Sequence, residues 1–282
     1  MSGPVAIPTR LSVAGVIAWR EAKATMRGVG GLAALTVALI AAIWVVLVDV
    51  RALRASGVLV LADPLKASMS TAILVLALFV AVSAAVSAAR DRESGTLEVL
   101  FYGPVDEVSY ILGKLGGLLL AYVAGLPLLI VSFAILSALT GFALTVPVVL
   151  GLCLSVIPAA EIIGFGVMLS VGTDRVRTAL LVLITTIAVL FGISIAYTMV
   201  LLVEIDDPSS SVLPLRDTLA ALDAVVRWIS PFAYLDRVVD GAASRAWRTA
   251  LAGLAASVAF TAAMTAIAAW WLRRRGVHRR GE

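Results

Sequence analysis

The chain has 282 residues, of which 61% are hydrophobic and only 14% charged, and its mean hydropathy is +1.06. Soluble domains contain about 25% charged residues, so this composition excludes a soluble globular protein and indicates an integral membrane protein. The net charge of +4 and the pI near 9.6 would suit a nucleic-acid partner. The basic residues are instead spread over the edges of apolar segments, where attraction to anionic membrane lipid explains them. We therefore expect membrane lipid as a partner and no nucleic acid.

Apolar runs long enough to cross a membrane, which takes about 20 residues, recur six times. They lie near residues 31–48, 68–89, 111–139, 146–171, 178–203 and 251–272. Pro127 lies inside the third run and cannot donate a hydrogen bond to the carbonyl of Val123, so we expect a kink or a break there. The alternation typical of an outer-membrane barrel is absent. The sequence predicts an all-α polytopic membrane protein, with six transmembrane helices in a single domain that spans residues 1–282.

Residues 12–27 precede the first span and are expected to form an amphipathic helix on the inner membrane surface. Arg20, Lys23 and Arg27 share one face at helical spacing. The apolar run before them has features of a signal peptide, but positive charges that follow such a run hold it in the cytoplasm. A disordered basic leader is the alternative.

The distribution of Lys and Arg predicts the orientation. If the N-terminus is cytoplasmic, the inside connections contain most of the 22 Lys and Arg residues, as the positive-inside rule requires. Trp270 and Trp271 beside the arginines at 273–275 are typical of an inner interfacial belt. We therefore expect a multi-pass protein of the plasma (inner) membrane with both termini in the cytoplasm.

A charged segment, residues 90–110, separates the second and third spans. Gly95 and the turn Gly103-Pro104 bracket a short helix, and residues 106–107 give an acidic start to the next one. The short helix has an apolar ridge, made of Leu97, Leu100 and Phe101, with Glu98 on another side. Such a helix fits a groove of a cytoplasmic partner. A solvated loop between two spans is the alternative.

The sequence contains no pattern for catalysis or metal binding. Cys153 and His278 are each alone, so the chain has neither a disulfide framework nor a set of metal ligands. The glycines around Lys114 suggest a phosphate loop, but Val108 and Leu115 stand where the motif G-x-x-x-x-G-K-[ST] needs glycine and a hydroxyl residue. We expect no enzymatic activity and no cofactor bound by this chain.

The charged segment carries a resemblance to a known family. Its sequence, with Glu93, Gly95-Thr96-Leu97-Glu98, Leu100, Gly103-Pro104 and Gly113-Lys114, resembles the signature E-x-G-T-L-E-x-L-L-x-x-P, followed by G-K, of the permease subunits of type-2 ABC exporters. The six spans, the lead-in helix and the elaborated segment between spans five and six also resemble this family. The chain departs from the signature at Phe101-Tyr102, where Leu and Ser are usual, and at Asp106, where a Ser-Arg pair is common.

The resemblance implies a permease that forms a translocation path as a dimer, preferably a homodimer. Separate ABC ATPase subunits would bind ATP and Mg²⁺ and drive transport. The implied ATPase contact consists of Glu93, Gly95, Leu97, Glu98, Leu100, Phe101 and Pro104. One alternative is an ATPase-driven membrane module that transmits motion to an extracytoplasmic partner without moving a cargo. Another is a secondary transporter, which would show an inverted repeat and more intramembrane charge.

Residues 204–248, between the fifth and sixth spans, are expected to form short external helices that lie at the outer surface or dip partly into the membrane. Pro214 favours a helix start, and Ser230-Pro231 ends it. By resemblance, the apolar residues here line an external gate, namely Leu219, Leu222, Val226, Ile229 and Phe232. Asp223 and other charged residues are expected on the opposite faces.

Glu161 is the one carboxylate deep inside a predicted span. An ionised carboxylate there is costly, so we expect it to face the bundle interior, a water-filled path or a partner, or to be protonated. A helix-helix hydrogen bond without a role in transport is the alternative. Gly164, Gly166 and Ser170 are expected to allow close helix approach nearby.

Overall fold

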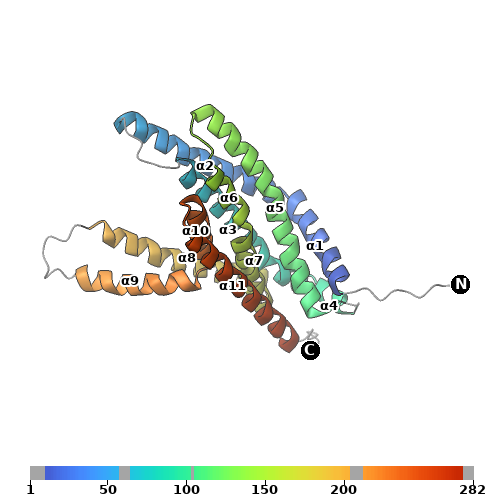
Figure 1. Cartoon of the computed structure of the whole chain (residues 1–282). Helices are drawn as coiled ribbons and strands as arrows, with labels where there is room; N and C mark the ends of the chain where they lie inside the picture. Colours follow the sequence, from blue (N-terminus) through green and yellow to red (C-terminus); the bar gives the residue numbers. More distant parts are fainter. Residues whose placement is uncertain (1–9, 57–63, 103–104, 204–211, 276–282) are drawn as a thin grey trace.

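The computed structural model describes residues 10–56, 64–102, 105–203 and 212–275, and within these ranges the chain consists of helices and contains no strand. Figure 1 shows a helical bundle from which α8 (Val176–Leu201) and α9 (Val212–Ile229) extend to one side. The predicted features at Gly103-Pro104, at residues 204–211 and at His278 lie outside the described residues.

Six helical segments of the described chain are long and apolar enough to cross a membrane, which confirms the predicted number. They are α2 (Val29–Ser56), α3 (Leu65–Glu93), α5 (Glu107–Thr140), the pair α6 (Val146–Leu154) and α7 (Val156–Gly172), α8, and α11 (Trp247–Arg275). Most of these helices extend beyond the predicted apolar runs, because a helix satisfies its own backbone groups and can continue into polar flanking residues. The chain is therefore a multi-pass membrane protein.

The fourth span is interrupted at Ser155, between α6 and α7. Pro158 has no N–H to donate to the carbonyl of Leu154, so the helix loses a backbone hydrogen bond at this point. The Ser155 hydroxyl lies 2.8 Å from the hydroxyl of Tyr122 on α5 and 2.6 Å from the carbonyl oxygen of Leu152. These hydrogen bonds provide polar partners where the helix is broken, and they attach the fourth span to α5.

The core forms where small residues let α3 and α7 approach closely. A Cβ at Gly166 would lie 2.6 Å from the Cβ of Ala84, which is closer than two side chains can stand. One turn later, the Ser170 hydroxyl accepts hydrogen bonds of 3.0 and 2.9 Å from the backbone N–H groups of residues 88–89. The expected close approach is thus confirmed at Gly166 and Ser170, whereas the spacing at Gly164 is that of ordinary van der Waals contact.

The helix α1 (Arg10–Arg27) packs against the first half of α5 (Figure 1). A Cβ at Gly113 would lie 2.7 Å from the side chain of Ile17, and one at Gly117 would lie 2.6 Å from the carbonyl oxygen of Ala18. The groove that receives α1 therefore exists because glycine has no side chain. The helical form expected for residues 12–27 is confirmed, which excludes a disordered leader over this range. Its basic residues, Arg20, Lys23 and Arg27, are exposed.

The helix α5 begins at Asp106, as the acidic start at residues 106–107 predicts. The Asp106 carboxylate accepts a hydrogen bond of 3.3 Å from the N–H of Ser109, as an N-cap residue does. Hydrogen bonds from Ser109, above all from its side chain, hold the pKa of Asp106 below its usual range, and Arg10 contributes at 3.4 Å. From here α5 continues unbroken through Pro127, so the break predicted at this proline is not found.

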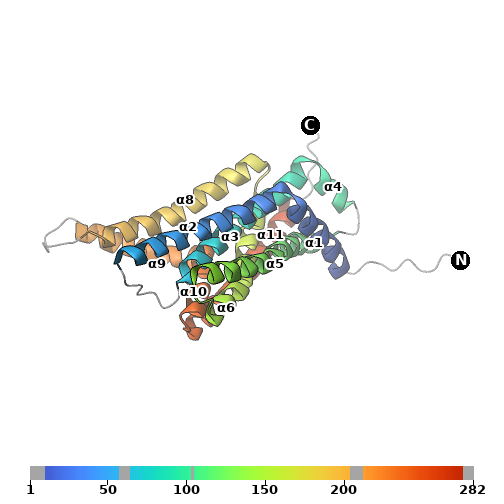
Figure 2. The ribbon, with the colours of Figure 1, turned by 90° about the horizontal axis from the view of Figure 1, so that it is seen from above.

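The segment between the fifth and sixth spans forms α9 and α10 (Pro231–Ala243), joined at Ser230, where the sequence predicts a helix end. Figure 1 and Figure 2 both show α9 alongside α8, and α10 packs against α6, α7 and α11. The ring of Phe232 lies 5.5 Å from that of Phe191, which is roughly 15 Å before the end of α8 at 1.5 Å per residue. The two helices therefore dip to the level of the spans.

Replacing Gly166 by alanine tests the α3–α7 contact. The added Cβ would collide with Ala84, so we expect Gly166→Ala to lower the stability by about 1–3 kcal/mol, as overpacking does. Gly192→Ala on α8 is the matched control, because nothing lies within 4 Å of a Cβ at that position. Thermal unfolding of the purified proteins in detergent should show a lower Tm for Gly166→Ala alone. Equal Tm values would contradict the close packing.

Candidate functional site

The short helix predicted within residues 90–110 is α4 (Thr96–Phe101), which connects α3 to α5 at one end of the bundle (Figure 1). Gly95 starts it with a φ of +69°, a backbone conformation that favours glycine. The hydroxyls of Ser94 and Thr96 lie 2.8 Å apart across this turn. The segment is therefore helical and packed, and the alternative of a solvated loop does not hold for residues 96–101.

The apolar ridge of α4 faces its own bundle. Leu97 is only 4% exposed and belongs to the core, so in this packing it is not available to a partner. Leu100 and Phe101 are half-buried against the same core, and the ring of Phe101 lies 6.1 Å from that of Tyr110. The ridge therefore holds α4 against the bundle, and a contact of Leu100 and Phe101 with a partner stays a prediction.

The outer face of α4 consists of Val99 and Tyr102, which are 71% and 79% exposed. Neither residue was predicted from the sequence to contact a partner. Their i, i+3 spacing could have indicated a second face, because it places them on the side of the helix opposite Leu97 and Leu100. Glu98 is half-buried beside them, and its carboxylate makes no hydrogen bond or ion pair with the described part of the chain. An apolar face with a carboxylate at its margin is thus presented outward.

Glu93 connects the end of α3 to the start of α8. Its carboxylate accepts a hydrogen bond of 2.9 Å from the N–H of Val176, the first residue of α8. A negative charge is favourable at a helix N-terminus, where backbone N–H groups have no partner within the helix. The carboxylate is exposed, so a further contact with a partner stays a prediction.

The neighbouring residue, Arg92, attaches α3 to the end of α7. Its guanidinium donates hydrogen bonds of 3.3 Å and 2.7 Å to the carbonyl oxygens of Val171 and Thr173 and lies 3.2 Å from the carboxylate of Asp174. A cation is favourable at a helix C-terminus for the same electrostatic reason that an anion is favourable at the N-terminus. The last turn of α3 therefore holds both ends of the α7–α8 connection.

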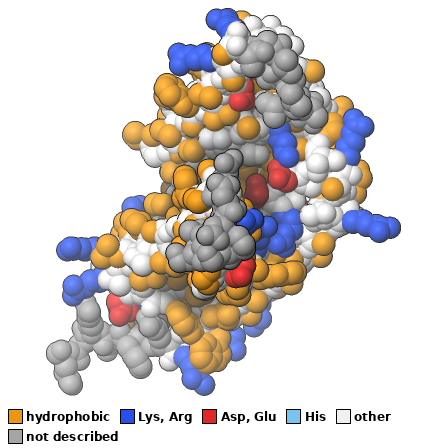
Figure 3. Space-filling model, turned by 90° about the vertical axis from the view of Figure 1, so that its left-hand side faces the viewer, with side chains coloured by type: hydrophobic (Ala, Val, Ile, Leu, Met, Phe, Trp, Pro, Cys, Tyr) orange, Lys and Arg blue, Asp and Glu red, His pale blue; other side chains and the backbone are white. Residues whose placement is uncertain are grey.

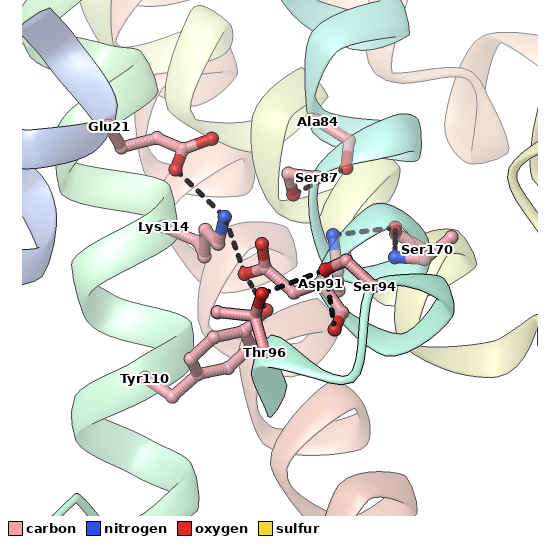
Figure 4. A network of polar contacts seen from close by, with 11 residues as sticks. Glu21, Ala84, Ser87, Asp91, Ser94, Thr96, Tyr110, Lys114 and Ser170 are labelled. Atoms are coloured by element: carbon pink, nitrogen blue, oxygen red, sulfur yellow. Dashed lines mark hydrogen bonds and ion pairs between the residues drawn. The ribbon is translucent and has the colours of Figure 1, made fainter. Parts of the chain in front are cut away.

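A buried cluster of charged residues lies directly behind α4 (Figure 4). The ammonium group of Lys114 on α5 lies 2.8 Å from the carboxylate of Glu21 on α1 and 2.9 Å from that of Asp91 on α3. The hydroxyl of Tyr110 donates a 2.8 Å hydrogen bond to the same Asp91 carboxylate. Three helices that are distant in sequence thus meet at one lysine.

The electrostatic consequence is that each member of this cluster depends on the others. The Lys114 side chain is 3% exposed, and an unpaired ammonium group at such a site would cost several kcal/mol. The sequence analysis noted Gly113-Lys114 as part of a motif but gave Lys114 no role. One feature of the sequence could have indicated a role for Lys114, namely its position one turn inside an apolar span. Glu21 and Asp91 flank the membrane at the same level.

Glu161 is fully buried on α7, so it faces the bundle interior, which is one of the expected environments. Neither carboxylate oxygen has a partner at hydrogen-bond distance in the described chain, and the alternative of a helix-helix hydrogen bond stays a prediction. The hydroxyl of Ser257 on α11, likewise without a hydrogen-bond partner there, is close enough to influence the carboxyl group.

A cavity of about 670 Å³ lies between α3, α8, α9 and α10, at the other end of the bundle from α4. Figure 3 shows the face on which α8 and α9 lie, where acidic and basic side chains gather around a hollow in a largely hydrophobic surface. Of the predicted gate residues, Val226 and Phe232 are buried and line the cavity. Leu222 and Ile229 are exposed and Leu219 is half-buried, and none of these three lines it.

Asp223 corrects the predicted orientation of α9. Expected on the outer face of the helix, it is buried, accepts a 2.8 Å hydrogen bond from the hydroxyl of Ser194 on α8, and pairs with Arg227 at 2.7 Å. This hydrogen bond and the polar cavity attract the charged side of α9 inward, which leaves its apolar side exposed. The five apolar residues therefore do not form one continuous surface, and a role of Val226 and Phe232 in a gate stays a prediction.

Within the described residues, no group of three or more His, Cys, Asp or Glu side chains could hold a metal ion. Compared with known proteins, the chain matches no family and no curated sequence.

Replacing Lys114 by methionine should remove the link between α1, α3 and α5. The change leaves Glu21 and Asp91 without their cation, so we expect a loss of stability of about 3–5 kcal/mol. Lys23→Met, at an exposed position of α1, is the control and should be nearly neutral. Because neutral clusters avoid the desolvation cost, Lys114→Met combined with Glu21→Gln and Asp91→Asn should recover part of the loss. Unchanged thermal unfolding of Lys114→Met would rule out a structural role for the cluster.

Proposed function

We propose that this protein is the permease subunit of an ATP-driven exporter of the type-2 ABC class. The observation that carries the proposal is α4, a short helix that buries Leu97 in the bundle and presents Val99 and Tyr102 outward. Exposed apolar residues on a helix at the end of a membrane bundle favour a protein partner, because they lie beside polar groups at the membrane edge. The resemblance of this segment to the permease signature supports an ATPase as that partner.

The contacts of α4 support mechanical coupling. A partner that pushes on Val99 and Tyr102 acts on a helix whose inner face touches Tyr110, a member of the Lys114 cluster. Through Glu93 and Arg92, the same region is attached to α7 and α8. Motion of α4 would thus reach α1, α3, α5, α7 and α8 through the Phe101–Tyr110 ring contact and through hydrogen bonds and ion pairs.

The energy source belongs to the partner in this proposal. The sequence has no phosphate loop, so ATP and Mg²⁺ would be bound by ABC ATPase subunits. The coupling end, with α1 and α4, would then face the cytoplasm, together with both termini, and the cavity would open toward the outside of the plasma membrane. The distribution of basic residues supports this orientation.

A second copy of the chain completes the proposed path. α2 and α8 bury few of their side chains, although both are strongly apolar. Their exposed faces suit lipid or a second copy. Within the described residues, α3 and α7 pack in the core, so one bundle has no open translocation path through its centre. We therefore propose a homodimer associated with two ATPase subunits.

Replacing Val99 by aspartate tests the α4 contact. The carboxylate would enter a desolvated interface, so we expect Val99→Asp to lose co-purification with the ATPase, and with it ATP-driven transport. The matched control is Val146→Asp at the start of α6, because Val146 is also 71% exposed but lies at the opposite end of the bundle. The measurement is pull-down after co-expression with ABC ATPases of the same genome. Wild-type recovery of the ATPase by Val99→Asp would overturn the proposal.

Cysteine labelling tests the orientation. In a Cys153→Ser background, we expect an impermeant maleimide added outside intact cells to label Ala143→Cys, between α5 and α6, and to leave Ser94→Cys unlabelled. Both positions are exposed, so the reagent reaches either one when cells are opened. Labelling of Ser94→Cys alone from outside would show the inverse orientation and would separate α4 from any cytoplasmic ATPase.

A further inference from the structure

The cavity between α3, α8, α9 and α10 has an apolar floor and a charged wall. Leu74 and Phe191 line its deeper part, about 14–15 Å from the nearest ends of α3 and α8 at 1.5 Å per residue, and the ring of Phe232 lies beside that of Phe191. Asp236 and Asp240 line it one to two turns closer to the end of α10. Its volume of about 670 Å³ falls within the range of small-molecule sites. The shape suits an amphiphile whose apolar part lies on the aromatic floor.

The positive charges at this cavity are already engaged. Arg227 pairs with Asp223 at 2.7 Å, and Lys66 pairs with Asp240 at 2.9 Å. The guanidinium of Arg237 lies 5.2 Å from the ring centres of both Trp228 and Tyr234 and donates a hydrogen bond to the carbonyl of Arg227. These cations have protein partners, so an anionic ligand would have to displace one of them.

Asp236 is different, because its carboxylate makes no hydrogen bond or ion pair within the described chain. It is accessible from the cavity, and Lys66 and Arg227 act on it from beyond ion-pair distance. Its partial removal from water, and then the negative charge of Asp240, raise the pKa of this carboxyl group. Its ionised form thus lacks the direct partner that a cationic ligand would supply.

We propose that this cavity binds a soluble cationic amphiphile, with its ammonium head on the Asp236 carboxylate and its apolar part against Phe191 and Phe232. The ammonium head would donate a charge-assisted hydrogen bond to Asp236, whose carboxylate has no direct partner in the described chain. The aromatic floor would bury the apolar part of the ligand. The binding itself needs no ATPase. The statement that such an amphiphile is the exported cargo rests on the function proposed above.

Binding can be measured on the full-length chain in phosphatidylcholine nanodiscs. The probes are spin-labelled dodecylammonium, dodecanol and dodecyl phosphate, which share one apolar chain and differ in head charge. The immobilised fraction in the electron paramagnetic resonance spectrum reports the bound probe. We expect the affinity for dodecylammonium to exceed that for the other two by about tenfold or more.

Two pairs of variants locate the site. Asp236→Asn should lower dodecylammonium binding by about tenfold, and Asp217→Asn, an exposed acid of α9 outside the cavity, should not change it. Thr71→Trp should fill the cavity and reduce binding of all three probes. Thr36→Trp on the exposed face of α2 is its matched control.

Equal binding of the three probes by the wild-type protein would overturn the proposal without recourse to any variant. So would unchanged dodecylammonium binding by a folded Asp236→Asn protein, judged by its gel-filtration profile. Competition from phosphatidylethanolamine added to the nanodiscs would show that a bilayer lipid occupies the cavity, which also contradicts the proposal. These results are independent of ATPase recovery by Val99→Asp, so failure of the cavity proposal and failure of the permease proposal are distinguishable.

Discussion

The burial of Lys114 is the constraint on which the α4 end of this protein depends. An ammonium group removed from water is tolerated only where carboxylates stand against it, and here these come from α1 and α3 while the lysine is on α5. The glycines at positions 113 and 117 let α1 come close enough for Glu21 to reach it. Charge burial and glycine packing therefore act at the same contact between α1 and α5.

The last turn of α3 extends this arrangement to the other helices. Asp91, Arg92 and Glu93 are consecutive, and because each residue of a helix turns by about 100°, they point in three directions. Asp91 reaches inward to α5, Arg92 reaches the C-terminus of α7, and Glu93 reaches the N-terminus of α8. Each charge meets a group of opposite sign, either a side chain or the end of a helix dipole. A run of charged residues that looks like a solvated loop in the sequence is in fact a junction of four helices.

The number of spans, the existence of α4 and the two helices after the fifth span could be predicted because they depend on hydropathy, glycine and proline. The orientation of individual helix faces could not. In a soluble protein an apolar face points to the core, but in a membrane the outward face is equally apolar, so the pattern does not distinguish the two. Hence Leu222 and Ile229 on α9 point outward and Asp223 points inward. The Lys114 cluster was not predicted because its members, at positions 21, 91 and 114, are distant in the sequence and meet only in the folded bundle.

Two helices that line the cavity, α3 and α8, extend to the α4 end of the bundle. They therefore connect the cavity to the Lys114 cluster. α3 contributes Thr71 to the cavity and Asp91 to the Lys114 cluster, roughly 30 Å apart along one helix. α8 starts at the Glu93 carboxylate and contributes Phe191 and Ser194 to the cavity. Because α3 is packed tightly against α7 at Gly166 and Ser170, the proposed coupling would move these two helices together. A tilt of α3 or of α8 would change the distance between the walls that face Asp236.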